Sequence, residues 1–245
     1  MTEDKRLIVD GKRGDGRTPE ELRNVRIETG MLKEADGSAY IEWGGNRIVC
    51  GVYGPKDCIP RHAADPYKAI LKCRYMMSPF ASQEEHGKSG PSRRSTELSK
   101  VIRHVFENLV IAERFPNTQI EIFLDVLQAS GGTRTASITA AAVALANAGI
   151  PMRDMVAAVS VGKADGKVLV DLDKEEDNSG QSDMPIAIAR NSKEILLLQM
   201  DGLLTKEEVE KALDLAERAV EKIGDMQEES LRQFYESPEK KKFVM

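Results

Sequence analysis

The order in which strand and helix patterns follow one another constrains this fold more than any other feature of the sequence. In the first half, runs with strand composition or alternation lie at residues 25–28, 39–43, 47–53, 70–77 and 120–126. Helical spacing is found over residues 98–110 and about 132–147, the second rich in alanine and suited to close packing.

A similar order returns in the second half of the chain. Strands are predicted at residues 157–162, 168–172, 184–189 and 195–199. A last helix begins at Thr205, which forms a capping box with Glu208. Strands followed by a helix, twice over, predict an α+β fold with two related halves in one compact domain.

The chain divides into three segments by composition. We expect residues 1–24, which are polar and rich in Gly, Arg and Lys, to form an irregular N-terminal arm. Residues 25–236 form the folded domain, with halves at about 25–155 and 156–236, and residues 237–245 form a flexible tail. Pro116 is expected to end the helix that precedes it.

Composition excludes several classes of protein. A chain of 245 residues with 41% hydrophobic residues can bury a core without disulfides, so its three cysteines are expected to be buried free thiols. No run approaches 18 apolar residues and the N-terminus is polar, so we expect a soluble, cytoplasmic protein with no membrane contact.

Charge is distributed unevenly along the chain. The net charge is −5, yet residues 56–103 hold ten Lys/Arg and five Asp/Glu and therefore carry +5, which leaves −10 for the rest. A basic segment on an acidic protein can form a local anion-binding face. A solvated surface of mixed charge is the alternative reading.

Common catalytic motifs are absent, but one glycine-rich turn points to anion binding. The sequence contains no nucleotide P-loop, dinucleotide-binding glycine motif, Gly-x-Ser-x-Gly or His-Glu-x-x-His. The segment Ser130-Gly131-Gly132-Thr133-Arg134 lies between a predicted strand and a helix start, where unpaired N–H groups and the helix dipole favour an anion. An ordinary strand-to-helix turn is the alternative.

Arginines in the first turns of two predicted helices strengthen the anion hypothesis. Arg134 occupies one helix start, and Arg93 and Arg94 occupy the other, where cations oppose the dipole. Phosphate would compensate these charges, because guanidinium binds its oxygens bidentately.

An acidic segment supplies the remaining candidate residues. Asp177 and Asp183 flank a glycine turn directly before an apolar strand, and such a pair can hold hydrated Mg²⁺ or act as a general acid. A solvated acidic hairpin is the alternative. An anion cradle, extra arginines and a carboxylate pair together indicate phosphoryl transfer on a polyanion.

The chain resembles the RNase PH family, and within it the catalytic ring subunits of archaeal exosomes. The matching motifs span nearly the whole chain in family order: Arg17-Thr18-Pro19, Pro60-Arg61-His62, Pro91-Ser92-Arg93-Arg94-Ser95-x-Glu97-Leu98, Leu127-Gln128, Gly132-Thr133-Arg134, Ala148-Gly149-Ile150-Pro151-Met152-Arg153-Asp154 and Glu176-Asp177-x-x-Gly180-x-x-Asp183-Met184-Pro185. Thr133 replaces the serine usual in the family, which keeps the hydroxyl and adds a methyl group.

The resemblance implies a duplicated α+β fold and a role for each candidate residue. It implies that Gly132, Thr133 and Arg134 bind inorganic phosphate as co-substrate. Arg93 and Arg94 would clamp phosphate and the RNA 3′ end, and Arg61 would contact the RNA backbone. Asp177 and Asp183 would supply the acid and Mg²⁺-binding functions, with Asp183 as the direct participant.

The implied activity is phosphate-dependent 3′-to-5′ degradation of RNA to nucleoside diphosphates, reversible to add 3′ tails. The implied partners are the 3′ end of single-stranded RNA, a paralogous subunit in a hexameric ring, and RNA-binding cap subunits. Three alternatives remain: a homo-hexameric RNase PH that trims tRNA 3′ ends, a catalytically silent RNA-binding ring scaffold, and a metal-dependent hydrolytic nuclease that releases monophosphates.

Overall fold

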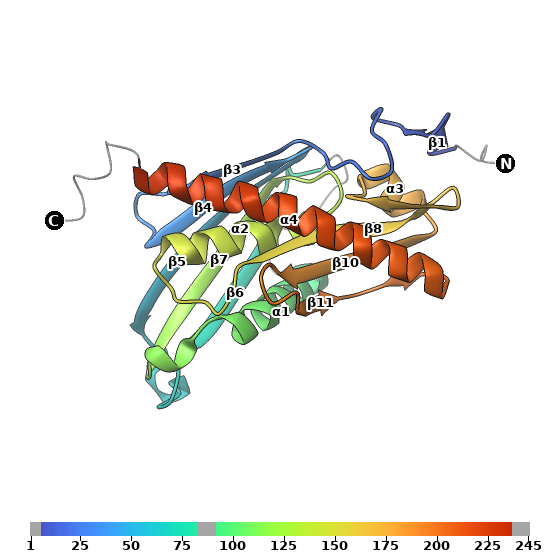
Figure 1. Cartoon of the computed structure of the whole chain (residues 1–245). Helices are drawn as coiled ribbons and strands as arrows, with labels where there is room; N and C mark the ends of the chain where they lie inside the picture. The colour runs from blue at the N-terminus through green and yellow to red at the C-terminus, as the bar shows by residue number, and fades with distance from the viewer. Residues whose placement is uncertain (1–5, 83–91, 237–245) are drawn as a thin grey trace.

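Two five-stranded β-sheets and the helices packed on them form the body of the described chain, and a two-stranded hairpin lies in the N-terminal arm. The computed structural model describes residues 6–82 and 92–236. Residues 83–91, between the fourth predicted strand and the first predicted helix, and the predicted tail at 237–245 lie outside the described residues. Figure 1 shows the first sheet in blue to green and the second in yellow to orange.

The first sheet has five strands in the order β3-β4-β5-β7-β6. Its strands are β3 (Val25–Thr29), β4 (Gly37–Trp43), β5 (Asn46–Asp57), β6 (Ile70–Met77) and β7 (Thr118–Gln128). The pair β6–β7 is parallel, and its other pairs are antiparallel. Because β6 and β7 are parallel, the segments that follow these two strands leave the sheet at the same end of the strands.

The second sheet has the order β11-β10-β8-β9, with β12 paired to β10. Its strands are β8 (Val156–Ala164), β9 (Lys167–Val170), β10 (Ser182–Ala189), β11 (Ile195–Leu198) and β12 (Asp201–Gly202). All of its pairs are antiparallel. The strand regions predicted from the sequence are therefore confirmed, and β12 is an addition.

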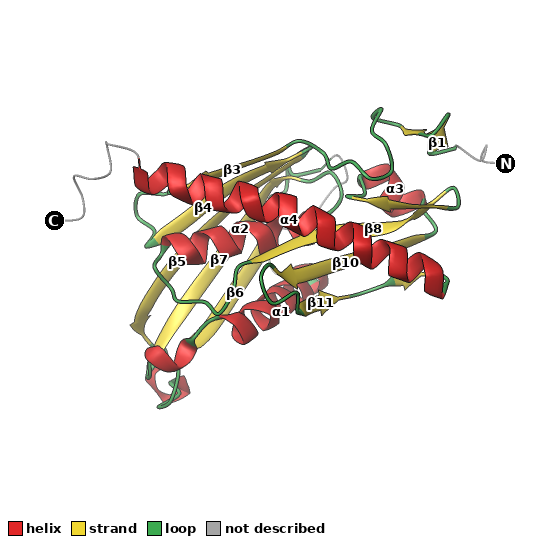
Figure 2. Ribbon diagram, in the orientation of Figure 1, coloured by secondary structure: helices red, strands yellow, loops and turns green. Residues whose placement is uncertain are grey.

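Three long helices bind the sheets into one unit. They are α1 (Arg93–Leu109), α2 (Thr133–Asn147) and α4 (Lys206–Glu236). Helix α2 contacts β4 and β5 of the first sheet and β8 of the second, while α4 crosses β3, β8 and β9 (Figure 2). Helix α1 packs on β6 and reaches β11.

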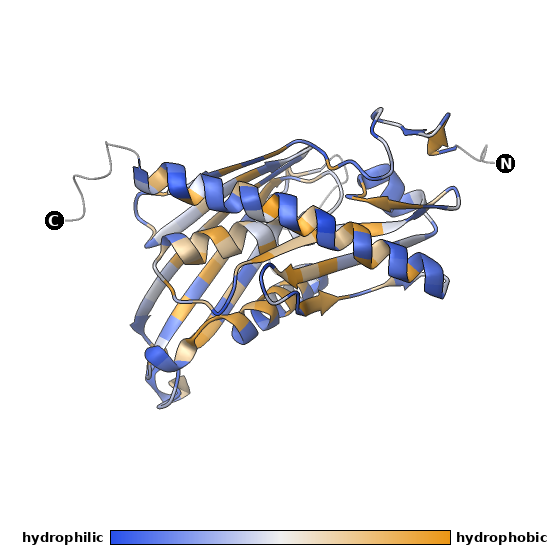
Figure 3. Cartoon of the chain, in the orientation of Figure 1, coloured by the Kyte–Doolittle hydropathy of each residue, from blue (hydrophilic) through white to orange (hydrophobic). Residues whose placement is uncertain are grey.

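One apolar core extends through both halves. Nearly the whole surface of α2 is buried, from Thr133 to Leu145, and its alanines let both sheets approach it closely. Figure 3 shows the other pattern on α4, where apolar and polar residues alternate around the helix. Residues of both sheets and of α1, α2 and α4 belong to the same buried cluster, which confirms the predicted α+β unit with two halves in contact.

The structure corrects one detail of the predicted helices and confirms another. Helix α1 ends at Leu109, before Pro116, because Val110 adopts an extended conformation and bridges Met152. A 3₁₀ turn, Ala112–Arg114, then precedes the proline. The predicted capping box of Thr205 and Glu208 is confirmed by both of its hydrogen bonds, at 2.9 and 3.3 Å.

The N-terminal arm is more ordered than its composition predicts. Strands β1 (Ile8–Val9) and β2 (Lys12–Arg13) pair antiparallel across Asp10 and Gly11, both of which have positive φ. An Asp-Gly pair between two short strands favours this tight hairpin turn. In Figure 1 the arm (dark blue) lies beside the short helix α3 (Lys174–Ser179).

The described residues contain free thiols and no membrane span. Cys50 and Cys58 are buried, Cys73 is half-buried, and none forms a disulfide. Burial raises the pKa of Cys73 to about 12, so this thiol is unreactive at neutral pH. Across residues 6–82 and 92–236, no helix combines the length and apolar character needed to cross a bilayer.

Candidate active site

The N-terminus of helix α2 is open toward a small anion. Gly132 is its N-cap residue, with φ of 70°, and no side chain caps the helix. No acidic residue lies in its first turn. The first N–H groups of α2 therefore lack a side-chain acceptor, and the positive end of the helix dipole remains uncompensated. These are the properties of an anion-binding helix start.

Two side chains from the first sheet hold the turn before α2. Asn46 accepts a hydrogen bond from the Ser130 N–H and donates one to the Gly131 carbonyl, both at 2.6 Å. Arg23 donates to the carbonyl oxygens of Ser130 and Gly131, at 2.6 and 3.3 Å. Because the carbonyl groups are bound on the protein side, the turn has a fixed shape before any ligand arrives.

Arg23 is itself fixed by a buried carboxylate. Asp171 accepts hydrogen bonds from Arg23 and, at 2.9 Å, from the Trp43 indole. Burial acts to raise the pKa of Asp171, but the Arg23 charge and these hydrogen bonds hold it below its ordinary value. The ionised pair anchors Arg23 under the glycine turn.

Gly131 brings the glycine turn against the acidic segment. A Cβ at this position would lie 2.5 Å from the carbonyl carbon of Asp173, and the residue has φ of 76°. Both facts require glycine. Asp173 is the N-cap of α3, so residues 42 positions apart in the sequence place the start of α3 beside the start of α2.

Thr133 presents a hydroxyl group whose proton is available. The buried Tyr75 hydroxyl donates to Thr133 Oγ1 at 3.0 Å. Because Thr133 accepts this bond, its own O–H can donate to a ligand oxygen. The hydroxyl that the sequence analysis singled out is thus held in one orientation by strand β6.

The guanidinium of Arg134 retains unused hydrogen-bond donors. Its Nε is buried and has no hydrogen-bond partner among the described residues, and its Nη2 lies 3.9 Å from Glu97 Oε1. A buried donor without a partner is costly, by about 1–3 kcal/mol. A bound anion beside α2 would satisfy it.

Asp177 on helix α3 lies close to Asp183 on the second sheet. Asp177 is exposed on α3, and Asp183 is half-buried on β10, within hydrogen-bonding reach of it. The segment predicted to be an acidic turn therefore contains a helix, because Asp173 and Glu176 form a capping box at its start.

Several groups set the acidity of Asp183. Burial, the largest effect, raises its pKa to about 6, and the Asp177 charge and hydrogen bond act in the same direction. A hydrogen bond from Ser160 on β8 and the charge of Arg134 lower it. The charge of Arg134 thus acts on Asp183, and Gly131 lies against Asp173 at the start of the helix that carries Asp177, so the carboxylate pair lies beside the anion-binding turn.

The carboxylate pair fits a hydrated magnesium ion but not a complete protein cage. Within the described residues, no three His, Cys, Asp or Glu side chains gather closely enough to hold a metal ion. Mg²⁺ is commonly held by one or two carboxylates together with water and substrate phosphates. Asp177 and Asp183 match that donor set.

The arginines of α1 reach this site unequally. Arg94 and Arg134 both act to lower the pKa of Tyr75, which burial raises, so Arg94 lies near the same turn. Arg93 is exposed in the first turn of α1. That helix differs from α2, because Ser92 and Ser95 form a capping box that already binds its terminal N–H groups. The resemblance between the two helix starts is therefore limited to their arginines.

Arg61 lies at the other end of the first sheet. It is exposed in a 3₁₀ turn, and the neighbouring Ile59 N–H bonds to Gln119 at the beginning of β7. The glycine turn follows the end of β7 at Gln128, and a strand of that length spans roughly 30–35 Å. The structure does not bring Arg61 to the other candidate residues.

The sequence analysis missed the residues that hold the site in shape. They are Arg23, Asn46, Tyr75, Ser160 and Asp171. A polar residue inside an apolar strand, such as Ser160, was the available signal for some of them. Their partners are far away in the sequence, so local patterns could not identify what they contact.

Comparisons with known proteins identify the two halves of the chain. The model of the 3′ exoribonuclease family, domain 1 (RNase PH), matches residues 21–151. The model of domain 2 of the same family matches residues 154–219.

Curated relatives match almost the full length. Exosome complex component Rrp41 of Thermococcus onnurineus is 53% identical over 234 residues, covering 95% of this chain and 94% of the relative. The component of the same name from Archaeoglobus fulgidus is 50% identical, covering 94% of this chain and 90% of the relative.

Solved structures share the fold at low sequence identity. Rice (Oryza sativa) Rrp46 superposes with a TM-score of 0.81 at 23% identity, covering 90% of this chain and 100% of that one. A chain from the Archaeoglobus fulgidus exosome with RNA bound to the active site gives a TM-score of 0.76 at 24% identity, covering 88% of this chain and 92% of that one.

Proposed function

Because the chain belongs to the 3′ exoribonuclease (RNase PH) family, we propose that it is the catalytic subunit of an exosome ring that degrades RNA phosphorolytically from the 3′ end. The observation that carries this proposal is the pairing of an uncapped helix start with a protonatable carboxylate. The start of α2 and Arg134 offer unused donors to phosphate, and Asp183 stands in the same electrostatic environment.

Phosphate is the co-substrate of the reaction, and residues of α2 bind it. The N–H groups after Gly132, the Thr133 hydroxyl and the Arg134 guanidinium together offer donors to three of its oxygens. A phosphate oxygen then forms a bond to the phosphorus of the terminal linkage. The bond from that phosphorus to the 3′ oxygen of the preceding nucleotide breaks, and a nucleoside diphosphate leaves.

Asp183 supplies the proton that the departing 3′ oxygen needs. Its pKa, raised to about 6 mainly by burial, keeps part of the carboxyl population protonated near neutral pH. A general acid works best when its pKa lies close to the operating pH. Ser160 holds one carboxylate oxygen, which orients the group.

Magnesium is proposed as the cofactor, held by Asp177, with the ionised form of Asp183 as the second candidate ligand. When bound, the cation supplies positive charge that neutralises phosphate oxygens in the transition state. The exposed position of Asp177 leaves room for the water ligands that Mg²⁺ retains.

Arginines guide the RNA toward this site. Arg94 lies near Tyr75 and the glycine turn, and Arg93 precedes it on the same exposed helix start, so both are proposed to bind phosphates at the RNA 3′ end. Arg61, at the opposite end of the sheet, is proposed to contact the RNA backbone farther from the 3′ end.

The proposed assembly is a hexameric ring built with a paralogous subunit and closed by RNA-binding cap subunits. The exosome names of relatives that are about half identical over nearly the whole chain support this assignment. Free thiols at Cys50, Cys58 and Cys73 suit a reducing compartment, and we place the protein in the cytoplasm.

Reconstitution tests this function. The chain is purified alone and together with its paralogous ring subunit, and decay of a labelled single-stranded RNA is followed with and without phosphate. We expect little activity from the chain alone, and phosphate-dependent decay from the assembled ring. A fully active homo-oligomer favours the tRNA-trimming alternative, and an inactive assembled ring favours the scaffold.

A further inference from the structure

Helix α3 is too short to hold Asp177 in place by itself. It has six residues, and an isolated helix of this length is unstable in water. Its start is closed by Asp173, which accepts hydrogen bonds from the Glu175 and Glu176 N–H groups, each at 2.9 Å. Glu176 returns the contact by accepting from the Asp173 N–H at 3.0 Å. Glu176 is therefore the residue through which α3 can be fixed.

Arg13 of the N-terminal arm binds this glutamate through both of its carboxylate oxygens. Its Nε donates to Glu176 Oε1 at 2.7 Å and its Nη2 donates to Oε2, in a two-pronged contact. The same guanidinium donates to the carbonyl oxygens of Val170 and Asp171, each at 2.7 Å. Both partners are buried, with 3% of Arg13 and 1% of Glu176 exposed.

Stability alone does not account for a buried ion pair. The cost of removing both charges from water offsets their attraction, so an apolar pair of similar size often stabilises a fold equally well. A planar guanidinium on a carboxylate does what an apolar pair cannot, because it fixes both distance and orientation. The residue fixed here immediately precedes Asp177.

We propose that Arg13 is a positioning residue: it holds Glu176 and thereby α3, so that Asp177 faces Asp183. The inference rests on the proposed catalytic role of the Asp177–Asp183 pair. Arg13 touches neither carboxylate of that pair and reaches Asp177 through the helix alone.

The arm is fastened on both sides of Arg13, as a positioning element requires. Before it, Ile8 packs in a small buried cluster with Ala164, Leu169 and Leu172. After it, the Pro19 carbonyl accepts a hydrogen bond from the Val170 N–H at 3.0 Å. Beside that contact a space remains between the arm and the domain.

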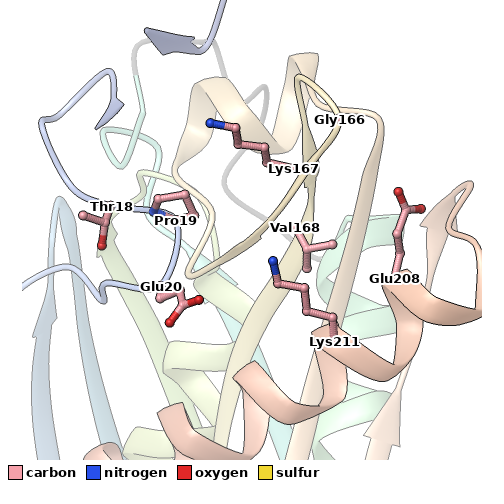
Figure 4. Close-up of a pocket in the computed structure, with 8 residues that line it drawn as sticks. All are labelled: Thr18, Pro19, Glu20, Gly166, Lys167, Val168, Glu208 and Lys211. Carbon is pink, nitrogen blue, oxygen red and sulfur yellow. The ribbon is translucent and has the colours of Figure 1, made fainter. Parts of the chain in front are cut away.

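An open groove separates this part of the arm from the domain. The groove has a volume of about 460 Å³ and lies between the arm and the β8–β9 hairpin with helix α4 (Figure 4). Its arm side is lined by Thr18, Pro19 and Glu20. Lys167, Val168, Glu208 and Lys211 form its other walls. The arm reaches α3 through the two hydrogen bonds that Arg13 donates to Glu176.

The test compares single and double variants of the pair in the assembled ring. Arg13→Met leaves the Glu176 charge buried and unpaired, and we expect kcat for phosphorolysis to fall at least about tenfold, since small displacements of reacting groups are costly. The KM for phosphate and the affinity for RNA stay within about twofold, because Arg13 makes no hydrogen bond to α1 or α2. Arg13→Lys, which keeps the charge but loses the fork, has an intermediate kcat.

The double variant Arg13→Met with Glu176→Met separates positioning from stability. With both charges removed, we expect the melting temperature to recover toward wild type while kcat stays low. Arg190→Met is the control for the loss of an ion-paired arginine. Arg190 directly follows β10, at the end away from Asp183, and pairs with Asp225 and Glu228 of α4. The substitution is expected to lower stability and leave kcat unchanged.

Hydrogen exchange gives a readout that does not depend on activity. The amides of Asp177 and Gly180 are bonded within α3, to the carbonyl groups of Asp173 and Glu176. In Arg13→Met they should exchange faster, with β8 and β10 unchanged. If Arg13→Met does not fold, the same measurements on the double variant and on Arg13→Lys test the proposal.

Two outcomes distinguish the inference from the function on which it rests. If Asp177→Asn retains full activity, the proposed role of Asp177 fails. The positioning role of Arg13 is wrong if Asp177→Asn is inactive while Arg13→Met keeps wild-type kcat and wild-type exchange in α3. The same result for the folded double variant would also show it to be wrong.

Discussion

The hydroxyl of Ser160 on β8 donates a hydrogen bond to Oδ1 of Asp183 on the adjacent strand β10. Burial raises the pKa of Asp183 to about 6, while this bond, which favours the ionised form, lowers it. The two strands are antiparallel neighbours inside the second sheet. The acidity of the proposed acid is therefore set by the sheet that carries it.

Ser160→Ala should raise the pKa of Asp183 further, because the variant lacks the hydrogen bond that stabilises its carboxylate. The side-chain carboxyl signal of Asp183 can be titrated by NMR in the isolated chain without divalent metal. Ser182→Ala is the matched control, since the buried Ser182 hydroxyl has no hydrogen-bond partner among the described residues. An Asp183 pKa that falls or stays constant in Ser160→Ala contradicts the assigned electrostatics.

Asp183→Asn should stabilise the fold at high pH and not at low pH. A carboxyl whose pKa is raised on folding contributes stability that is complete below its unfolded pKa, near 3.8, and is lost as pH rises through about 6. Asparagine does not ionise, so the variant should gain on the order of 1–3 kcal/mol over wild type above pH 7. Urea unfolding at pH 4 and pH 8 with a chelator measures this. A variant no more stable than wild type at pH 8 would overturn it.

Arg134→Ala should reduce phosphate-dependent decay much more than RNA binding. Its Nε is a buried donor without a partner in the described structure, next to the open start of α2, so its removal should raise the KM for phosphate at least about tenfold. Decay rates at limiting and saturating phosphate measure the effect. Arg218→Ala, at an exposed position of α4, is the control, and equal behaviour of the two variants would exclude a phosphate role.

Arg93→Glu combined with Arg94→Glu should weaken RNA binding and flatten its salt dependence. Each single-strand phosphate that is no longer neutralised lowers the slope of log affinity against log salt by about 0.7, hence about 1.4 for two. Filter binding across a salt series measures it. Arg218→Glu with Lys222→Glu makes the same charge change on the exposed side of α4. If both double variants behave alike, the basic start of α1 does not bind RNA.

Periodicity predicted most of the fold because each element has a local cause. The strand Ile70–Met77 and the alanine-rich helix α2 lie where the sequence pattern predicts them. Helix α3 was missed because its apolar stripe is absent and its stability comes from the Asp173–Glu176 capping box. The contacts that order the arm, from Arg13 to Glu176 for example, were not predicted because they join residues 163 positions apart.

The positions of the candidate residues at the helix start were predictable from the sequence, and those of the carboxylates less so. Gly132, Thr133 and Arg134 lie at an open helix start as expected, and Asp177 meets Asp183. Asp183 is a half-buried residue of strand β10 itself and does not merely precede the strand, because it pairs with Gly162 on β8. Contacts such as Gly131 with Asp173 depend on how the two halves pack, which no local pattern encodes.

The identity of the released nucleotide tests the central claim most directly. Phosphorolysis exchanges a phosphodiester for a diphosphate anhydride, so it loses little free energy and can run in both directions. The assembled ring is incubated with a labelled oligoribonucleotide and Mg²⁺, first with phosphate and then with excess nucleoside diphosphates and no phosphate. We predict nucleoside diphosphates as products in the first reaction and untemplated 3′ extension in the second. Asp183→Asn should abolish both, because the two directions share one transition state. Release of nucleoside monophosphates alone, or a variant that loses one direction and keeps the other, would contradict the account.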